Sequence, residues 1–412
     1  MCRRSMLEIY NQKFIKQICM LFLKFTFEIR QRGINMNAIE NKPVSQRNSS
    51  IELLRIISMA MIVLNHFASH GGFSFDTKVL TVPRLWYYFI LMGGQIGVDV
   101  FILISGYFLA VSSSKNFNLK KVLKFWGQVA FYSVAFYFIF CAVGKVDFKL
   151  SSCVKAIFPI TFDSWWFAST YFVLYLIHPF INMLLQKLDK KSYQALIVIE
   201  LILWSVIPTF TTASYQSNNL IWFITLYCIG GYIRTFGLNP RFTRKHYVCF
   251  LILFSALRYL SCVVLMLLGT KIQFAANHSV IFYTRQSVLT LLCALSFFMI
   301  FEKWNLRYNK RINLIASASF GVYLIHENIF VSPLLWQELF KNADYQNSLL
   351  IIPYSVMAAL LVYVVCTLID LLRQYAFEKP FMKLVNRYSE KITKPFEFII
   401  DFVKGIVFGK EN

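Results

Sequence analysis

The feature that most constrains this chain is a series of ten apolar runs, each close to the length needed to cross a bilayer. A transmembrane helix takes about 20 apolar residues. Within lipid, a helix satisfies its backbone hydrogen bonds internally. The sequence therefore predicts an all-α fold, a polytopic membrane bundle of about ten helices. The predicted spans are residues 52–70, 84–111, 122–143, 165–186, 193–210, 219–236, 247–269, 281–301, 312–334 and 348–372.

The composition agrees with a membrane protein and argues against a nucleic-acid-binding protein. Apolar residues make up 57% of the 412 residues and charged residues only 15%, which is far from the balance of a soluble protein. The net charge is +22, but Lys and Arg lie in short clusters between the apolar runs. The predicted inner loops hold 15 of these cations and the outer loops 7, so both termini are predicted to be cytoplasmic.

The apolar runs divide the chain into three predicted parts. Residues 51–375 form a ten-helix membrane domain. Residues 1–50 precede it as an N-terminal cytoplasmic segment, and residues 376–412 follow as a basic cytoplasmic tail.

Residues 1–35 allow two interpretations. Their short apolar patch is interrupted by Lys24, so it is not predicted to span; it could form a basic amphipathic helix on the cytoplasmic surface. We prefer the hypothesis that translation starts at Met36, because residues 31–33 can be encoded by a purine-rich run resembling a bacterial ribosome-binding site. N-terminal sequencing that finds Met1 or Cys2 would reject it.

The first apolar run, Ile51–Gly71, carries ionisable residues where hydrocarbon makes them costly. Arg55 and His66 are 11 residues apart, which places them on one helix face and about 16 Å apart along its axis. Glu52 is positioned to pair with Arg55 at i, i+3. One interpretation is a site with an anion-binding cation and a base on one helix. The other is that Arg55 reaches lipid phosphate and His66 bonds to a neighbouring helix.

The second run and the stretch that follows it contain further candidates. Asp99 is a carboxylate inside a span and needs a partner, for which we predict His66 or an arginine; the alternative is a single bonded Asp in a packing helix. Lys120, Lys121 and Lys124 lie at the predicted cytoplasmic rim. They are either positive-inside anchors or ligands for the phosphates of a molecule that enters from the cytosol.

Polar residues recur in the later runs. The ninth run holds Tyr323, His326 and Glu327. Ionisable residues also occur in four other runs, namely His178, Glu200, Arg258 and Arg285. So many intramembrane polar groups predict a polar cavity inside the bundle. The nine cysteines are scattered and include no C-x-x-C pair, so neither a metal site nor a disulfide framework is predicted.

Four landmarks in order give the chain a family resemblance. They are ELLRIISMAMIVLNH with its Arg55-x10-His66 spacing, GVDVFILISGYFL (97–109), the basic stretch at 120–124, and SFGVYLIH (319–326). Together they resemble the membrane acyltransferase family 3, over roughly residues 50–375. The resemblance implies a ten-span enzyme of the bacterial plasma membrane that moves acyl groups, often acetyl, from cytosolic acyl-CoA to hydroxyls of cell-surface glycans.

The resemblance also implies roles for the first-span residues. His66 is expected to act as general base toward a sugar hydroxyl, or to carry the acyl group as a covalent imidazole intermediate. Arg55 is expected to hold CoA phosphates, and Glu52 to orient Arg55. Glu52 stands where the family often has Asp, a conservative departure.

The remaining site residues follow from the other landmarks. Lys120, Lys121 and Lys124 are expected to assist in phosphate binding, although the family commonly has Arg in this stretch, and Arg binds phosphate in a bidentate manner. Asp99 is expected to position the acceptor or tune a neighbouring group. Tyr323 and His326 are expected to line the acceptor side.

The functional hypothesis is thus an integral membrane O-acetyltransferase that uses acetyl-CoA, without a metal, in polysaccharide biosynthesis. Its expected partners are the bilayer, acyl-CoA and a saccharide acceptor, and not nucleic acid. The alternative is a transporter or flippase for a lipid-linked saccharide, which would have cations along its whole cavity and no acyl-CoA site. A sensor or scaffold is a third hypothesis, against which the absence of a sizeable soluble domain counts.

Overall fold

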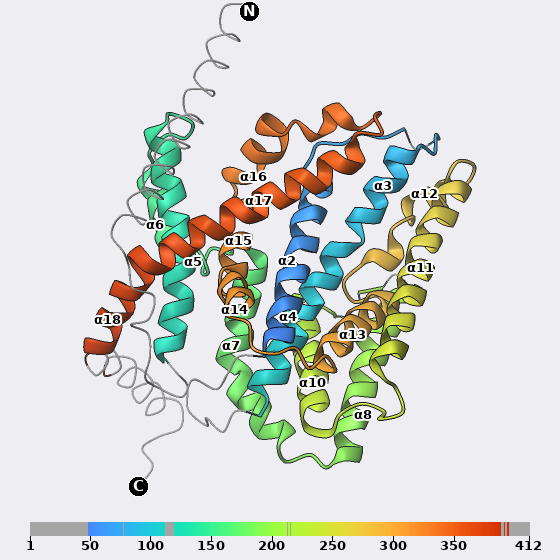
Figure 1. Cartoon of the computed structure of the whole chain (residues 1–412), viewed down its shortest axis with the longest axis horizontal. Coiled ribbons are helices and arrows are strands. Elements are labelled where there is room, and N and C mark those ends of the chain that lie inside the picture. Colours follow the sequence, from blue (N-terminus) through green and yellow to red (C-terminus); the bar gives the residue numbers. More distant parts are fainter. Residues whose placement is uncertain are drawn as a thin grey trace, which may run out of the picture. The chain divides into compact units, whose positions relative to one another are not determined.

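The computed structural model describes residues 48–388 except 77, 112–118, 212 and 215, together with residues 391 and 394. Over this part, the chain forms helices joined by turns and contains no β-strand, as Figure 1 shows. The predicted all-α class is confirmed. The predictions for residues 1–35 fall outside the described residues.

The helices follow the predicted spans closely. Their bounds are α2 (Ser49–Ser69), α3 (Val82–Leu91), α4 (Gly93–Leu109), α5 (Leu119–Ala142), α6 (Leu150–Ile157), α7 (Trp166–Leu185), α8 (Lys190–Leu201), η1 (Ile202–Val206), α9 (Ile207–Thr211), α10 (Asn219–Phe236), α11 (Arg244–Gly269), α12 (Gln273–Asn277), η2 (Ile281–Tyr283), α13 (Val288–Glu302), α14 (Lys310–Ser317), α15 (Ser319–His326), α16 (Val331–Pro333), η3 (Leu334–Leu339), η4 (Asn342–Tyr345), α17 (Ile351–Arg373), η5 (Gln374–Glu378) and α18 (Lys379–Arg387).

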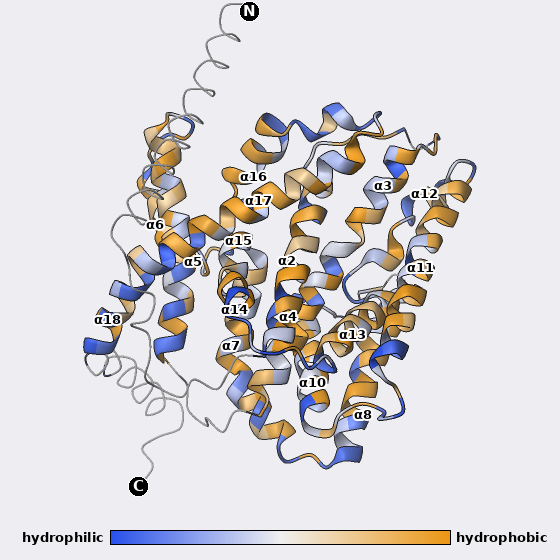
Figure 2. Cartoon of the chain, in the orientation of Figure 1, coloured by the Kyte–Doolittle hydropathy of each residue, from blue (hydrophilic) through white to orange (hydrophobic). Residues whose placement is uncertain are grey.

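The described residues contain eight helices that are long and apolar enough to cross a membrane, or nine if one bent pair counts as a span. The other predicted span corresponds to α10, whose 18 residues include Asn219 and Arg234, and such polar residues lower its mean hydropathy. Figure 2 shows hydrophobic residues along the helices and hydrophilic residues gathered at helix ends and turns. The chain is a multi-pass membrane protein.

Helix α2 is the central element of the bundle. It packs against α3, α4, α13, α14, α15 and α17, and Figure 1 shows it among these helices. Its start is fixed by Asn48, whose side-chain oxygen accepts hydrogen bonds from the backbone N–H groups of Ser50 and Ile51. Because α2 contacts elements from both halves of the chain, residues on it can meet side chains from distant segments.

Helices α4 and α10 approach each other through glycines. A Cβ added at Gly106 would lie 2.3 Å from the Tyr227 carbonyl oxygen, and one added at Gly230 would lie 2.4 Å from the Leu103 carbonyl oxygen. Neither helix could keep this distance with a side chain at these positions. Small residues at such contacts are typical of membrane helices, whose association depends on close packing.

The second predicted span, 84–111, is broken into α3 and α4 at Met92. Carbonyl groups at the break receive side-chain donors: Arg258 donates to the Met92 carbonyl at 2.7 Å, and Asn65 donates to that of Leu91 at 2.6 Å. Arg258 also donates to two carbonyls at residues 282 and 283 and is fully buried. Arg258 therefore stabilises backbone that cannot bond to water, rather than lining a cavity.

The ninth predicted span, 312–334, also differs from a straight helix. Residues Lys310–His326 form α14 and α15, and the chain then bends by 89° into Val331–Tyr345. At the bend, the side-chain oxygen of Asn328 accepts from the Phe330 N–H, and its carbonyl accepts from the Ser332 N–H. Irregular backbone at membrane depth occurs where protein or a polar site surrounds it. The bend places His326 and Glu327 beside the end of α2.

A buried carboxylate fixes the position of α15. Asp370 of α17 accepts hydrogen bonds from Tyr132 and Gln374, each at 2.8 Å, and forms an ion pair with Arg373 at 2.8 Å. A Cβ at Gly321 of α15 would lie 2.0 Å from an Asp370 oxygen, so only glycine lets the two helices meet here. The contact holds the helix that ends at His326.

Candidate active site

Four titratable side chains from two distant segments converge at the end of α2. His66 lies in the last turn of α2, and His70 follows as its C-cap. His326 is the last residue of α15, and Glu327 comes directly after it. The side chains of His66 and Glu327 are 16% and 17% exposed, that of His70 is 38% exposed, and His326 is fully buried. The cluster is thus most open to solvent at His70.

Hydrogen bonds fix which ring nitrogens carry protons. His326 Nδ1 lies 2.6 Å from the Val322 carbonyl oxygen. A carbonyl only accepts, so His326 Nδ1 carries the proton and the neutral ring has its lone pair on Nε2. His66 Nδ1 lies 2.9 Å from that Nε2 and donates to it. The neutral His66 ring therefore has its own lone pair on Nε2, where it is available as a base.

Glu327 supplies negative charge to both histidines of α2. Its Oε2 lies 2.9 Å from His66 Nδ1 without a well-aligned hydrogen bond, so that contact is chiefly electrostatic. Its Oε1 lies 3.2 Å from His70 Nε2, and this hydrogen bond raises the pKa of His70, against the opposing effect of burial. The Glu327 carboxylate therefore lies against both histidines of α2.

The other end of α2 carries the predicted Arg55–Glu52 pair. The guanidinium Nη1 and a Glu52 oxygen are 3.9 Å apart, at the limit of an ion pair. Arg55 Nε and Glu52 Oε2 are buried and make no hydrogen bond within the described residues. The Arg55 side chain is 32% exposed. Its hydrogen-bonding capacity is therefore not exhausted by its neighbour, as a ligand-binding cation requires.

The three predicted phosphate-binding lysines differ from one another. Lys120 and Lys121 are exposed in the first turn of α5. Lys124 forms an ion pair with Glu378 at 2.7 Å, and Glu378 also pairs with Arg373 at 2.8 Å. The ion pair of Lys124 joins α5 to the chain after α17, and the Lys124 side chain is still 51% exposed, so all three lysines are accessible.

Asp99 does not reach His66. It is fully buried in α4, where one oxygen accepts from the indole N–H of Trp222 at 3.0 Å. Its other oxygen makes no hydrogen bond within the described residues, and Arg285 lies near enough for electrostatic interaction. Of the two predicted partners, His66 or an arginine, the structure places an arginine near Asp99, and the carboxylate that contacts His66 belongs to Glu327.

The two predicted acceptor-side residues lie next to each other. The Tyr323 ring is 6.4 Å from the His326 ring and 5.7 Å from that of Phe167. The Tyr323 hydroxyl is buried and has no hydrogen-bond partner among the described residues. His326 bonds directly to His66, a contact that the sequence did not predict.

Sequence reasoning did not assign roles to Glu327 and His70. The sequence marks Glu327 only as an ionisable residue of the ninth run. The available signal was the adjacency of Glu327 to His326 and the one-turn spacing of His66 and His70. Neither signal shows that the two segments meet, since this depends on the bend after α15.

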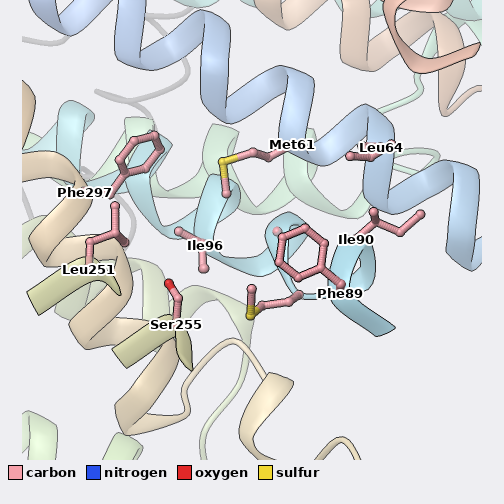
Figure 3. A pocket seen from close by; sticks show the side chains of 10 residues that line it. Met61, Leu64, Phe89, Ile90, Ile96, Leu251, Ser255 and Phe297 are labelled. Carbon is pink, nitrogen blue, oxygen red and sulfur yellow. The ribbon is translucent and has the colours of Figure 1, made fainter. Parts of the chain in front are cut away.

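An apolar pocket lies apart from the histidine cluster. This pocket, of about 250 Å³, lies between α2, α3, α4, α11 and α13, and Figure 3 shows Met61, Phe89, Ile96 and Phe297 around it. Met61 and Leu64 point away from the His66 face of α2, because successive helical residues are about 100° apart. This pocket has the character of a site for a hydrocarbon chain rather than for acid–base chemistry.

Comparison with known proteins agrees with this geometry. The family model Acyl_transf_3, described as an acyltransferase domain, matches residues 48–370. The match covers most of the chain, including α2 with His66 and the bend with Glu327. No curated protein and no solved structure matches the chain.

Proposed function

The chain belongs to the acyltransferase family 3, and from this premise we propose that it is a bacterial plasma-membrane O-acetyltransferase. The proposed donor is cytosolic acetyl-CoA, and the proposed acceptor is a hydroxyl of a cell-surface or exported polysaccharide. The observation that supports it most is the environment of His66, which lies on the same helix as Arg55: its Nδ1 is hydrogen-bonded to His326 and lies 2.9 Å from a Glu327 oxygen. As the family is one of acyltransferases, the transporter alternative is not retained.

His66 has the role of general base. A sugar hydroxyl is a poor nucleophile until its proton is removed, and a positioned base contributes about 10²–10⁴-fold to the rate. The lone pair on His66 Nε2 takes the proton, while Nδ1–H stays bonded to His326. The imidazolium that forms is stabilised by the Glu327 carboxylate 2.9 Å away. Glu327 is thus a positioning residue that acts through His66.

Arg55 binds the donor at the opposite end of α2. Its guanidinium holds CoA phosphates by charge-assisted hydrogen bonds, with Lys120 or Lys121 as further cations. Glu52 limits the positions that Arg55 adopts. About 16 Å of helix separates Arg55 from His66, which suits an elongated donor with its phosphates at one side and its thioester inside the bundle.

Two chemical routes use the same residues. In direct transfer, the deprotonated hydroxyl attacks the thioester carbonyl and CoA thiolate leaves. In covalent transfer, His66 Nε2 attacks the thioester, CoA thiolate leaves, and the hydroxyl then displaces the imidazole from the acyl group. Because His66 lies in the last turn of α2, and the predicted orientation turns that end outward, the acceptor is modified toward the outer face.

The test uses purified protein in nanodiscs with radiolabelled acetyl-CoA. We expect wild type and His66→Ala to bind the donor equally, and only wild type to transfer acetyl to cell-envelope glycan and release free CoA thiol. Acid-labile label on wild-type protein without acceptor would identify the covalent route, and its absence the direct one. Transfer by His66→Ala would remove His66 from the chemistry. Failure of the protein to bind any member of an acyl-CoA panel would reject the proposed donor.

A further inference from the structure

We propose that His66, His70 and Glu327 form a binding site for a zinc-class divalent cation, and that the bound cation inhibits acyl transfer. The binding site stands on geometry alone. The inhibition rests on the proposed function of His66. By zinc-class cations we mean Zn²⁺ and divalent ions such as Co²⁺ that bind the same ligands. Imidazole and carboxylate groups together are typical ligands of these ions.

The first observation is the spacing of the two histidines. His66 and His70 are four residues apart at the end of α2, and the backbone N–H of His70 donates to the His66 carbonyl at 3.0 Å, so the helical turn continues through both. Two histidines at i and i+4 on one helix face are the arrangement with which helices bind zinc. Their ring centroids are 5.1 Å apart.

The second observation is the third ligand. Glu327 reaches the histidines from the bend after α15, and one ligand atom from each of the three residues lies within 4.8 Å of the others. In tetrahedral zinc sites, neighbouring ligand atoms are about 3.3 Å apart, given metal–ligand bonds of about 2.0–2.1 Å. The Glu327 oxygens already lie 2.9 and 3.2 Å from the histidine nitrogens. The three side chains are therefore close to the separations that such a site requires.

The surroundings favour a cation and give it access. Glu327 carries the negative charge of the cluster, and its Oε2 lacks a well-aligned hydrogen bond. His70 is the most exposed of the three residues and lies beyond the last residue of α2, which gives an entry path from the aqueous side. Two histidines and one glutamate leave a fourth position open, as in His₂Glu zinc sites. With a metal on His66 Nε2, the Nδ1 proton stays bonded to His326, which then supports the ring.

Occupation of this site blocks the proposed base whichever nitrogen of His66 binds. A metal on Nε2 takes up the lone pair that accepts the hydroxyl proton. A metal on Nδ1 leaves the proton of the neutral ring on Nε2, which then donates instead of accepting. The cation also neutralises the Glu327 charge that stabilises the imidazolium. Metal-bound protein is therefore an inactive form of the enzyme.

The experiment measures metal binding and transfer separately. Metal-free protein in nanodiscs is titrated with Co²⁺, whose visible absorption reports tetrahedral coordination, and the Co²⁺ is then displaced with Zn²⁺. We expect one saturable site in wild type and affinity at least about 10-fold lower in His70→Gln, since removing even a supporting partner costs this much. Glu327→Gln is a second variant of the same site. His278→Gln, which removes a histidine of the α12 end, is the matched control and is expected to bind like wild type.

Absence of a saturable Co²⁺ signal in wild type would reject the proposed cation site. Equal affinity in wild type, His70→Gln and Glu327→Gln overturns it as well, and shows binding elsewhere. Inhibition is scored as the ratio of transfer rates with and without Zn²⁺ within each protein. Full transfer at saturating Zn²⁺ overturns the inhibitory role. Saturable binding in a protein that transfers no acyl group under any condition rejects the proposed function and leaves the metal site standing.

Discussion

At the scale of single residues, the chemistry of His66 depends on a carbonyl that it does not touch. The Val322 carbonyl fixes the proton of His326 on Nδ1, and this leaves His326 Nε2 as the acceptor for His66. The proton on His66 Nδ1 then leaves Nε2 free. A chain of two hydrogen bonds thus sets the tautomer of the proposed base, and a Glu327 oxygen lies 2.9 Å from its Nδ1.

Substituting Glu327 tests this arrangement. We expect Glu327→Gln to lower kcat for acetyl transfer by about 10²-fold or more, by analogy with loss of the carboxylate in other carboxylate–histidine pairs, with KM for acetyl-CoA unchanged. Glu327→Asp keeps the charge and is expected to recover part of kcat. Steady-state kinetics on metal-free protein check this. A rise in KM with kcat intact would show that Glu327 acts in donor binding instead.

Substituting Arg55 tests the donor end of α2. We expect Arg55→Ala to raise KM for acetyl-CoA about 10-fold or more, because a charge-assisted hydrogen bond contributes about 1.5–3 kcal/mol. Arg55→Lys keeps a point charge, so its KM for acetyl-CoA is expected to lie between the values of wild type and Arg55→Ala. Binding measured by isothermal titration with CoA checks the result. An unchanged affinity in Arg55→Ala would mean that Arg55 anchors α2 at the membrane surface.

At the scale of elements, two broken spans and one close helix contact organise the bundle. The break at Met92 is stabilised by buried Arg258 and Asn65, and the bend after α15 brings Glu327 to α2. The contact between α4 and α10 depends on glycines at which any side chain would clash. These features depend on where the backbone breaks and which helices touch. The apolar pattern of each run fits a straight helix as well as a broken one, so it does not predict them.

The α4–α10 contact gives a stability prediction. We expect Gly230→Ala to reduce the free energy of unfolding by about 1–3 kcal/mol, because the added methyl must displace packed backbone. Gly93→Ala is the matched control, since its Cβ would meet Met61 at 3.4 Å, an ordinary contact distance. Thermal unfolding in detergent compares the two. Equal unfolding midpoints for both variants and wild type would contradict the close contact.

At the scale of the whole molecule, the proposed mechanism requires donor and acceptor to meet α2 from opposite sides of the membrane. The charge bias of the loops predicts cytoplasmic termini, which places Arg55 at the inner side and His66 toward the outer side. The exposed positions Lys155 in α6 and Lys310 at the start of α14 then lie on opposite faces.

Thiol labelling of intact cells tests this orientation. In a cysteine-free background, we expect a membrane-impermeant reagent to modify Lys155→Cys and to leave Lys310→Cys unmodified until the cells are permeabilised. The two variants control for each other, because both replace an exposed lysine. The reverse pattern would put His66 at the cytoplasmic side and would require an acceptor inside the cell.

The sequence by itself determined the all-α class and the approximate positions of the apolar helices, because bilayer thickness and the need to satisfy backbone hydrogen bonds make a helix the solution for each long apolar run. It also singled out Arg55 and His66, because ionisable residues on one face of a span are costly and helical spacing is fixed. Only the tertiary structure decided that Glu327 rather than Asp99 contacts His66, and that Lys124 is occupied by Glu378. The physical reason is that pairing between distant segments depends on where spans bend and which helices touch. The hydrophobicity of a run specifies neither of these.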